Sequence, residues 1–294
     1  MLLTLSDMLL MAQKNKYAVL APDFFNLDFA QILLDSAQEK QAPLILSYCH
    51  TPYNTFELDD MDQCIRIVRG LCSEIAVPIV LHLDHAENIE TIHKYLDLGF
   101  TSVMIDASTH PFEENIIVTQ KVVELARIYK ASVEAELGHV GNGSNYLVND
   151  PASKKLTNLE QVQDFIQQTD VDALAISIGT QHGFYQETDG LHLDLLEKIA
   201  NATTIPLVLH GTSGTDHTQL KKAVEKGIRK LNIFTELFAA YQQASSQFSL
   251  NNLEEVNKMN SSRRNAVLNK LAAFYELSDS IGRADDFTKK PGTA

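Results

Sequence analysis

The sequence predicts a single α/β domain over residues 1–294, folded as a (β/α)8 TIM barrel with extra C-terminal helices. At 294 residues and 45% hydrophobic composition, the chain can bury one large core. Eight short apolar runs alternate with amphipathic segments, without a break in composition. Near-continuous apolar runs are typical of parallel strands covered on both faces, and eight such units fit a closed barrel. A doubly wound open sheet is the alternative, disfavoured because no GxGxxG or Walker sequence follows the first strand.

The elements follow in a regular order. An amphipathic first helix is expected, with Ser6 or Asp7 near its N-cap. The eight predicted strands are 17–24, 43–49, 78–85, 102–108, 132–140, 173–179, 206–211 and 230–235. Apolar residues recur at helical spacing between them, in 27–39, 88–98, 113–130, 158–168 and 217–226. A C-terminal helical extension at about 238–280 contains the helical patterns 237–248 and 257–277, and a polar tail follows at 283–294. The long segment 141–156 is a candidate mobile active-site loop.

Charge and composition exclude several classes of function. The chain has 24 Lys+Arg against 38 Asp+Glu, a formal net charge of −14, which disfavours nucleic-acid binding. Small phosphorylated ligands remain compatible, because backbone N–H groups at helix starts bind them. No apolar run is long enough to cross a membrane. The three cysteines show no disulfide or metal-site spacing, which indicates a cytoplasmic protein.

Histidines follow three of the predicted strands. The third strand ends in His82-Leu83-Asp84-His85, where alternation places His82 and Asp84 on one face and His85 at the rim. His182 and His210 follow the sixth and seventh strands. Taken singly, each is better explained as a hydrogen-bonded structural residue. Because the strand ends of a barrel converge, the three together have the composition of a catalytic zinc site with one open position.

Other polar residues lie at the same end of the predicted barrel. Asp106 follows the fourth strand, where it could also cap a helix, and Glu134 and Glu136 share one face of the fifth. A glutamate inside a barrel is costly unless it is paired or bound to a cation. Ser213 and Thr235 follow strands seven and eight, where barrels commonly bind phosphate, although ordinary turns use the same residue types.

Six blocks of sequence together resemble the class II, zinc-dependent ketose-bisphosphate aldolases, and especially their tagatose-bisphosphate branch. The blocks are LHLDH, VMIDAS, SVEAELGHVG, IGTQHGFY, VLHGTSG and KLNIFTEL, and the match runs from about Tyr17 to Leu237. The resemblance implies a lyase of carbohydrate metabolism. Such an enzyme reversibly cleaves a ketose 1-phosphate or ketose 1,6-bisphosphate to dihydroxyacetone phosphate and an aldehyde. It also implies a homodimer or homotetramer.

The same resemblance assigns roles to individual residues. Asp84 would transfer the proton of the aldehyde oxygen. His85, His182 and His210 would bind Zn²⁺, with Asp106 and Glu136 at an alternative zinc position. A monovalent cation, Na⁺ or K⁺, would bind near the phosphate loops. No lysine Schiff base is needed, and no lysine is expected among the strand-end residues. The positions that would hold dihydroxyacetone phosphate are Gly183, Gly211, Ser213, Asn232 and Thr235.

The chain departs from the family pattern at the aldehyde end of the site. Asp23 stands where the family has Asn, Cys49 where it has Ser or Thr, and the C-terminal region lacks the family's Asp-Pro-Arg. Because these positions serve the second phosphate, we expect an unphosphorylated aldehyde or a phosphate held differently. Arg263 or Arg264 could compensate, unless both lie on a solvated helix face.

Two further departures bear on activity. Between Gly141 and Asp150 the loop has no carboxylate where the family moves a proton, so Asp150 or Tyr146 would take that task. A slow or non-catalytic phosphosugar-binding homologue on the same barrel is therefore the alternative function. Phe234 and Phe238 stand where the family has small or polar residues, and Phe234 would narrow the pocket. An amidohydrolase barrel is disfavoured because the first strand lacks His-x-His.

Overall fold

The computed structural model describes residues 1–50, 58–141, 155–183, 190–248 and 252–288. Tyr146 and Asp150, the two candidate proton-transfer residues of the long loop, lie outside the described residues.

Eight parallel strands pair in sequence order and close on themselves, β8 beside β1. This closed barrel confirms the predicted fold and excludes the open sheet. The longest pairing is between β2 and β3, where six residues of each strand lie opposite one another. The strands are β1 (Val19–Pro22), β2 (Leu44–Cys49), β3 (Ile79–Ala86), β4 (Ser102–Ile105), β5 (Ser132–Leu137), β6 (Ala173–Ile176), β7 (Leu207–Leu209) and β8 (Ile228–Ile233).

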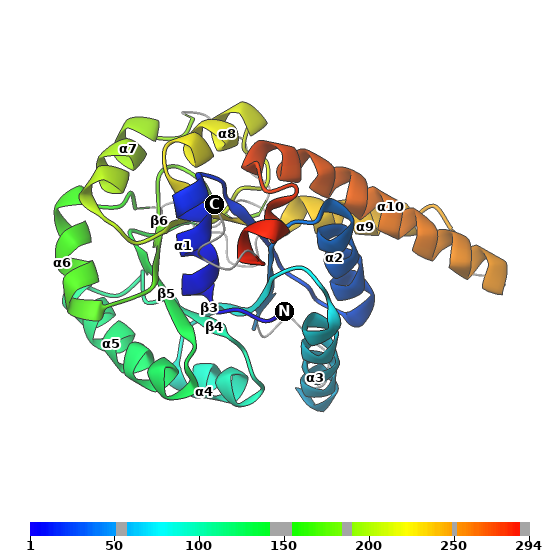
Figure 1. Ribbon diagram of the computed structural model, residues 1–294, viewed down its shortest axis with the longest axis horizontal. Coiled ribbons are helices and arrows are strands. Elements are labelled where there is room, and N and C mark those ends of the chain that lie inside the picture. The colour runs from blue at the N-terminus through cyan, green and yellow to red at the C-terminus, as the bar shows by residue number, and fades with distance from the viewer. Residues whose placement is uncertain (51–57, 142–154, 184–189, 249–251, 289–294) are drawn as a thin grey trace.

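Helices surround the strands, and the last helices of the chain, after β8, project beyond the barrel (Figure 1). The segments α3 and α7, not among those predicted, supply the helices after β2 and β6. No helix in the described part of the chain is long and apolar enough to cross a membrane. The helices are α1 (Leu5–Asn15), α2 (Leu27–Lys40), α3 (Leu58–Glu74), α4 (Ile89–Asp97), α5 (Phe112–Tyr129), α6 (Leu159–Thr169), α7 (Leu193–Ala202), α8 (His217–Glu225), α9 (Thr235–Ser245), α10 (Leu253–Ser278) and the 3₁₀ helix Arg283–Phe287.

Local sequence explains where several helices begin. The side chains of four asparagines accept a hydrogen bond from the first turn of α2, α4, α6 and α10, as N-caps do. The N-cap of α1 is Thr4, whose hydroxyl accepts from the Asp7 amide, so Ser6 and Asp7 lie in the first turn, near the cap as expected. At the other end of the chain, Ala284 N donates to Gln41 O and ties the 3₁₀ helix to the end of α2.

The core has two parts. Most buried apolar side chains lie between the strands and the surrounding helices. A second cluster fills the N-terminal end of the barrel, where Leu5, Met8 and Leu9 of α1 pack against Val19, Val80 and other inward-facing residues. In Figure 1, α1 lies across the barrel opening. This helix closes the end of the barrel opposite the strand ends that carry the polar residues.

The closure by α1 predicts a stability effect that is separate from the active site. Leu9→Ala should lower the free energy of unfolding by about 2–5 kcal/mol, because Leu9 is fully buried in the second cluster. Leu10→Ala is the matched control, since Leu10 is 51% exposed and its loss should cost less than about 0.5 kcal/mol. Denaturant unfolding of both variants measures the difference. If both variants lost the same free energy of unfolding, the stabilising role of α1 at the N-terminal end of the barrel would be contradicted.

Candidate active site

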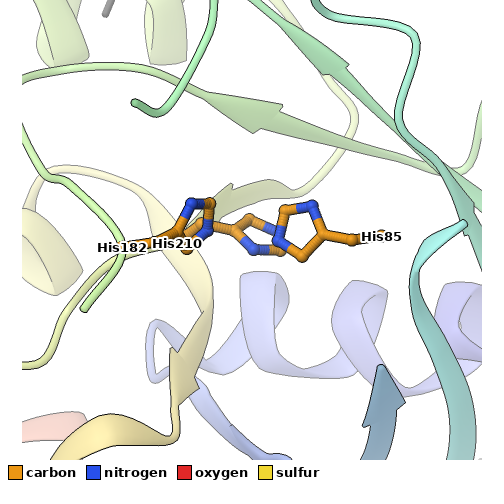
Figure 2. A group of neighbouring side chains, drawn as sticks. All are labelled: His85, His182 and His210. Atoms are coloured by element: carbon orange, nitrogen blue, oxygen red, sulfur yellow. The ribbon is translucent and has the colours of Figure 1, made fainter. Parts of the chain in front are cut away.

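Three histidines converge at the C-terminal ends of β3, β6 and β7. The ring centroids of His85 and His210 are 4.5 Å apart, and that of His182 is 4.7 Å from His85 and 5.9 Å from His210. One ring nitrogen of each lies within 4.8 Å of the others. Figure 2 shows the His85 ring facing the other two. The predicted convergence of these residues is therefore present in the fold.

A backbone irregularity aims His85 at this point. Its φ is 46°, in the left-handed region that a residue with a side chain rarely adopts, and the β3–β4 register shifts between Leu83 and Ala86. The ring nitrogen Nδ1 then lies 2.9 Å from Asp106 Oδ2. Since a carboxylate only accepts, Nδ1 carries a proton, and Nε2 is the ring nitrogen left to bind a metal ion. Burial alone would lower the pKa of His85, but Asp84 and Asp106 raise it to about 10.

His210 is oriented through its opposite nitrogen. Its Nε2 donates to Glu134 Oε1 at 2.8 Å, which leaves Nδ1 with a lone pair. Burial, together with His85, lowers the pKa of His210. Burial and the two neighbouring imidazoles lower the pKa of His182 further below its usual value. Both rings are therefore neutral near pH 7, the form in which imidazole binds metal ions.

Lys230 of β8 is a buried cation that the sequence reasoning did not single out. It lies in the middle of the strand rather than at its end, and it is fully buried inside the barrel. Its ammonium donates to Glu134 Oε2 at 2.7 Å. Burial alone would raise the pKa of Glu134, but Lys230 and His210 lower it to about 2. Lys230 is two residues before Asn232 and shares its face of the strand, but Glu134, the partner that holds it inside the barrel, is on another strand.

Asp84 is held at the centre of the barrel mouth. Asn232 Nδ2 donates to both of its oxygens, at 3.1 and 3.0 Å. One of these oxygens lies 3.8 Å from His85 Nε2. Burial would raise the pKa of Asp84, but His85, His210 and Lys230 hold it well below its usual range. Asp84 is therefore an oriented carboxylate beside the three histidines.

Asp106 and Glu136 lie on the outer side of His85. The three residues form a second group whose possible ligand atoms lie within 4.8 Å of one another. Asp106 accepts from Ser108 Oγ and does not cap α5, whose N-cap is Pro111. Burial and the Asp106 carboxylate raise the pKa of Glu136 well above its usual value. Asp106 thus orients the His85 ring, and Glu136 Oε2 is buried with no hydrogen-bond partner among the described residues.

The chemistry of this donor set fits a metal cation. Among the described residues, no hydrogen-bond partner is found for His85 Nε2, His210 Nδ1 or Glu136 Oε2, although all three atoms are buried. Buried polar atoms without partners are costly and rare in folded proteins. Three imidazoles beside a carboxylate match the ligands of Zn²⁺, which binds deprotonated histidine nitrogens at about 2.0–2.1 Å.

The predicted phosphate-binding residues surround the neighbouring strand ends. Gly211 has a φ of 64°, and a Cβ added there would lie 2.5 Å from Gln181 O, so only glycine fits between the turns after β6 and β7. Ser213 is buried and its Oγ lies 3.4 Å from the Glu236 amide, one residue into α9. Thr235 is the first residue of that helix, and Gly183 follows His182. A helix start with small residues around it is suited to an anion.

Asp23 and Cys49 lie on the β1–β2 side of the barrel mouth. Cys49 is opposite Asp84 in the β2–β3 pairing, and Asp23 bridges to Ser47 on β2. Burial and the Asp84 carboxylate raise the pKa of Asp23 well above its usual value. This side of the mouth therefore brings a thiol and a second carboxyl group close to Asp84.

Aromatic rings gather beyond Asp23. The Phe234 ring stacks on Phe238 at 5.4 Å, and Phe25 contacts both, with centroid distances of 6.4 and 5.2 Å. Arg263 lies over the Tyr241 ring. Arg264 forms ion pairs with Asp35 and Glu39 of α2. Both arginines, considered above as compensating groups, are thus engaged by α2, α9 or α10 residues.

Comparison with known proteins identifies relatives along nearly the whole chain. A family model described as fructose-bisphosphate aldolase class-II matches residues 3–283. The chain is 38% identical over 242 residues to the D-tagatose-1,6-bisphosphate aldolase subunit GatY of Klebsiella oxytoca, covering 82% of this chain and 84% of that protein. It is 38% identical over 257 residues to a fructose-bisphosphate aldolase of Staphylococcus aureus strain Mu50, covering 87% and 88%.

A solved structure agrees with the sequence relatives. The crystal structure of the YdjI aldolase from Escherichia coli K12 superimposes with a TM-score of 0.84 at 29% identity. The superposition covers 97% of this chain and 100% of that one.

The converging histidines predict that the protein binds one Zn²⁺ and that each ring contributes. His210→Ala should weaken zinc binding by more than about 100-fold, because losing a ligand costs more than the 10–100-fold typical of outer residues. His110→Ala is the control, since His110 is exposed and outside the cluster. Titration of the metal-free protein with zinc against a competing chelator measures both. Unchanged affinity in His210→Ala would contradict the site.

Proposed function

The chain belongs to the class II fructose-bisphosphate aldolase family and is a carbon–carbon lyase, and from that premise we propose a specific reaction. The proposed reaction is reversible cleavage of a ketose 1-phosphate or ketose 1,6-bisphosphate, of tagatose or fructose type, to dihydroxyacetone phosphate and an aldehyde. The observation that carries the proposal is the convergence of His85, His182 and His210 beside an oriented Asp84.

The three histidines would hold Zn²⁺ through His85 Nε2, His210 Nδ1 and a His182 ring nitrogen. Asp106 and Glu134 support this role, because they fix the protons of His85 and His210 on the nitrogens that face away. When bound, zinc supplies Lewis-acid stabilisation of the negative charge that develops beside the substrate carbonyl.

Asp84 would move the proton of the aldehyde oxygen. Cleavage needs a base for the hydroxyl next to the breaking carbon–carbon bond, and the reverse reaction needs the corresponding acid. The carboxylate is suited to this role because Asn232 holds it in one orientation beside the histidines. Proton transfer to the dihydroxyacetone phosphate carbon would fall to another group, and the candidates Tyr146 and Asp150 lie outside the described residues.

The phosphate of dihydroxyacetone phosphate would bind at the ends of β7 and β8. Ser213 and Thr235 offer hydroxyls there, and the first turn of α9 offers backbone N–H groups. Gly183 and Gly211 would allow the backbone to approach the ligand closely. The phosphate contacts lie away from the reacting carbons, and their binding energy then holds those carbons in position.

The aldehyde half of the substrate would carry no phosphate. Asp23 and Cys49 replace an amide and a hydroxyl donor. Cys49 lies opposite Asp84 in the β2–β3 pairing, and Asp23 bridges to Ser47 of β2. Phe25, two residues after Asp23, contacts the ring of Phe234. Carboxyl, thiol and aromatic groups bind a phosphate poorly, but a carboxyl group can accept hydrogen bonds from the hydroxyls of an uncharged aldehyde.

Asp84→Asn should lower kcat by about 100- to 10,000-fold, the usual contribution of an acid–base residue, and should leave zinc content unchanged. Enzyme-coupled detection of dihydroxyacetone phosphate measures the loss, and metal analysis checks the zinc. Glu87→Gln is the control, because Glu87 is an exposed carboxylate three residues away.

The same assay distinguishes the alternative function. A wild-type protein that binds ketose phosphates but releases no dihydroxyacetone phosphate would be a phosphosugar-binding homologue. The sequence of the 141–156 segment, which has no carboxylate before Asp150, is the observation that favours this alternative.

The aldehyde assignment predicts a substrate preference. The kcat/KM for ketose 1-phosphates should exceed that for the matching 1,6-bisphosphates by at least about tenfold, equivalent to about 1.4 kcal/mol. In the double variant Asp23→Asn/Cys49→Ser the ratio should move toward the bisphosphates, because both hydrogen-bond donors of the family pattern return. A strong wild-type preference for bisphosphates would end the assignment without affecting the aldolase proposal.

A further inference from the structure

Lys230 lies inside the barrel beneath the three histidines, surrounded by polar side chains from two other strands, β3 and β5. Its Nζ is 2.7 Å from Glu134 Oε2 and 2.9 Å from His82 Nε2. It is also 3.7 Å from Asp84 Oδ1. Lys230, Glu134 and His82 are fully buried. A buried lysine is costly unless it is paired and hydrogen-bonded, so this arrangement requires an explanation.

Lys230 lies within one of the clusters of side chains that could otherwise bind a metal ion. His82, Asp84 and Glu134 have possible ligand atoms within 4.8 Å of one another. The ammonium of Lys230 already lies among them and donates to two of the three. His82 Nε2 accepts from Lys230, so its proton is on Nδ1, which lies 2.8 Å from Ser102 Oγ. The cluster is thus occupied by an internal cation.

Glu134 connects this cation to His210. Its Oε2 accepts from Lys230 and its Oε1 accepts from His210 Nε2, so each carboxylate oxygen has a separate partner. An ionised carboxylate can only accept, which fixes the direction of both bonds. Held at Oε2, the carboxylate keeps Oε1 against His210, and the ring keeps its proton on Nε2.

We propose that Lys230 is a positioning residue of the metal site, which acts through Glu134 to keep His210 Nδ1 deprotonated and turned toward His85 and His182. The proposal rests on the zinc site of the proposed function, but its structural part concerns the His210 tautomer and holds without metal. Lys230 forms no covalent bond with substrate in this role.

Lys230→Met removes the ammonium and keeps an unbranched side chain of similar length. The variant should bind zinc about 10–100-fold more weakly, the range typical of changes to groups that orient metal ligands. In the metal-free protein, ¹⁵N NMR of histidine should show His210 as the Nε2–H tautomer in the wild type and as a tautomer mixture in the variant. The His210 signals are assigned by their loss in His210→Asn.

Arg229→Met is the matched control. Arg229 precedes Lys230 on β8 and is also buried, but its guanidinium donates to Val224 O and Ile228 O on the outer side of the strand. The Arg229→Met variant therefore loses a buried cation and its hydrogen bonds, but it keeps every contact of the histidines. Zinc affinity and the His210 tautomer should be unchanged in this variant even if its stability falls.

A double-mutant cycle tests the route through Glu134. Glu134→Gln should weaken zinc binding by itself, and Lys230→Met should add little further loss in that background. If Lys230→Met does not fold, Lys230→Leu, which also removes the donor, takes its place in every measurement. A folded Lys230 variant with wild-type zinc affinity and an unchanged His210 tautomer overturns the proposal, and so do fully additive losses. A wild-type protein that binds no zinc overturns the zinc part of the proposed function, while the tautomer measurement still decides the role of Lys230.

Discussion

The interior of the barrel is organised around a buried ion pair between Lys230 and Glu134. Ionisable groups on neighbouring strands cannot face one interior unless each finds a partner of opposite charge or a hydrogen bond. Here the ammonium balances Glu134, contacts His82 and lies near Asp84, so β3, β5 and β8 are joined at their centres. The ion pair also supports the histidine cluster, because His210 donates a hydrogen bond to the same Glu134. Removing one partner of such a pair leaves an uncompensated buried charge, which is why the cluster constrains every strand that enters it.

Much of the fold and of the site follows from local sequence. Strand alternation correctly placed His82 and Asp84 on one face, and the shared destination of strand ends correctly brought His85, His182 and His210 together. Lys230 was missed because β8 begins at Ile228, two residues before the apolar run was taken to start. A lysine at the edge of a predicted strand is ordinarily assigned to solvent, and only its partner Glu134 on another strand reveals that it faces inward. Long-range pairing of this kind is absent from a single sequence.

The positive φ of His85 could not be predicted from the sequence, for a different reason. Nothing in the residue types of Leu83–Ala86 requires a left-handed residue, and the conformation arises where the β3–β4 pairing shifts register. Strain of this kind persists only where surrounding contacts hold it, and it is concentrated at functional sites. The hydrogen bond from His85 Nδ1 to Asp106 is one such contact. The departure from regular geometry therefore coincides with the residue that must point out of the strand and across the barrel mouth.

The two carboxylates that hold His85 and His210 contact opposite ring nitrogens. His85 uses Nδ1 toward Asp106, and His210 uses Nε2 toward Glu134, yet each leaves its other nitrogen facing the same point. The difference follows from position: His85 turns at the rim of β3, with its neighbour Asp106 at the end of β4, whereas His210 reaches down to a carboxylate within the barrel. The outer carboxylate is itself a potential metal ligand, as part of the group with Glu136, but the inner one is committed to Lys230. His85 is therefore held from the rim of the barrel by Asp106, and His210 is held from within it by Glu134.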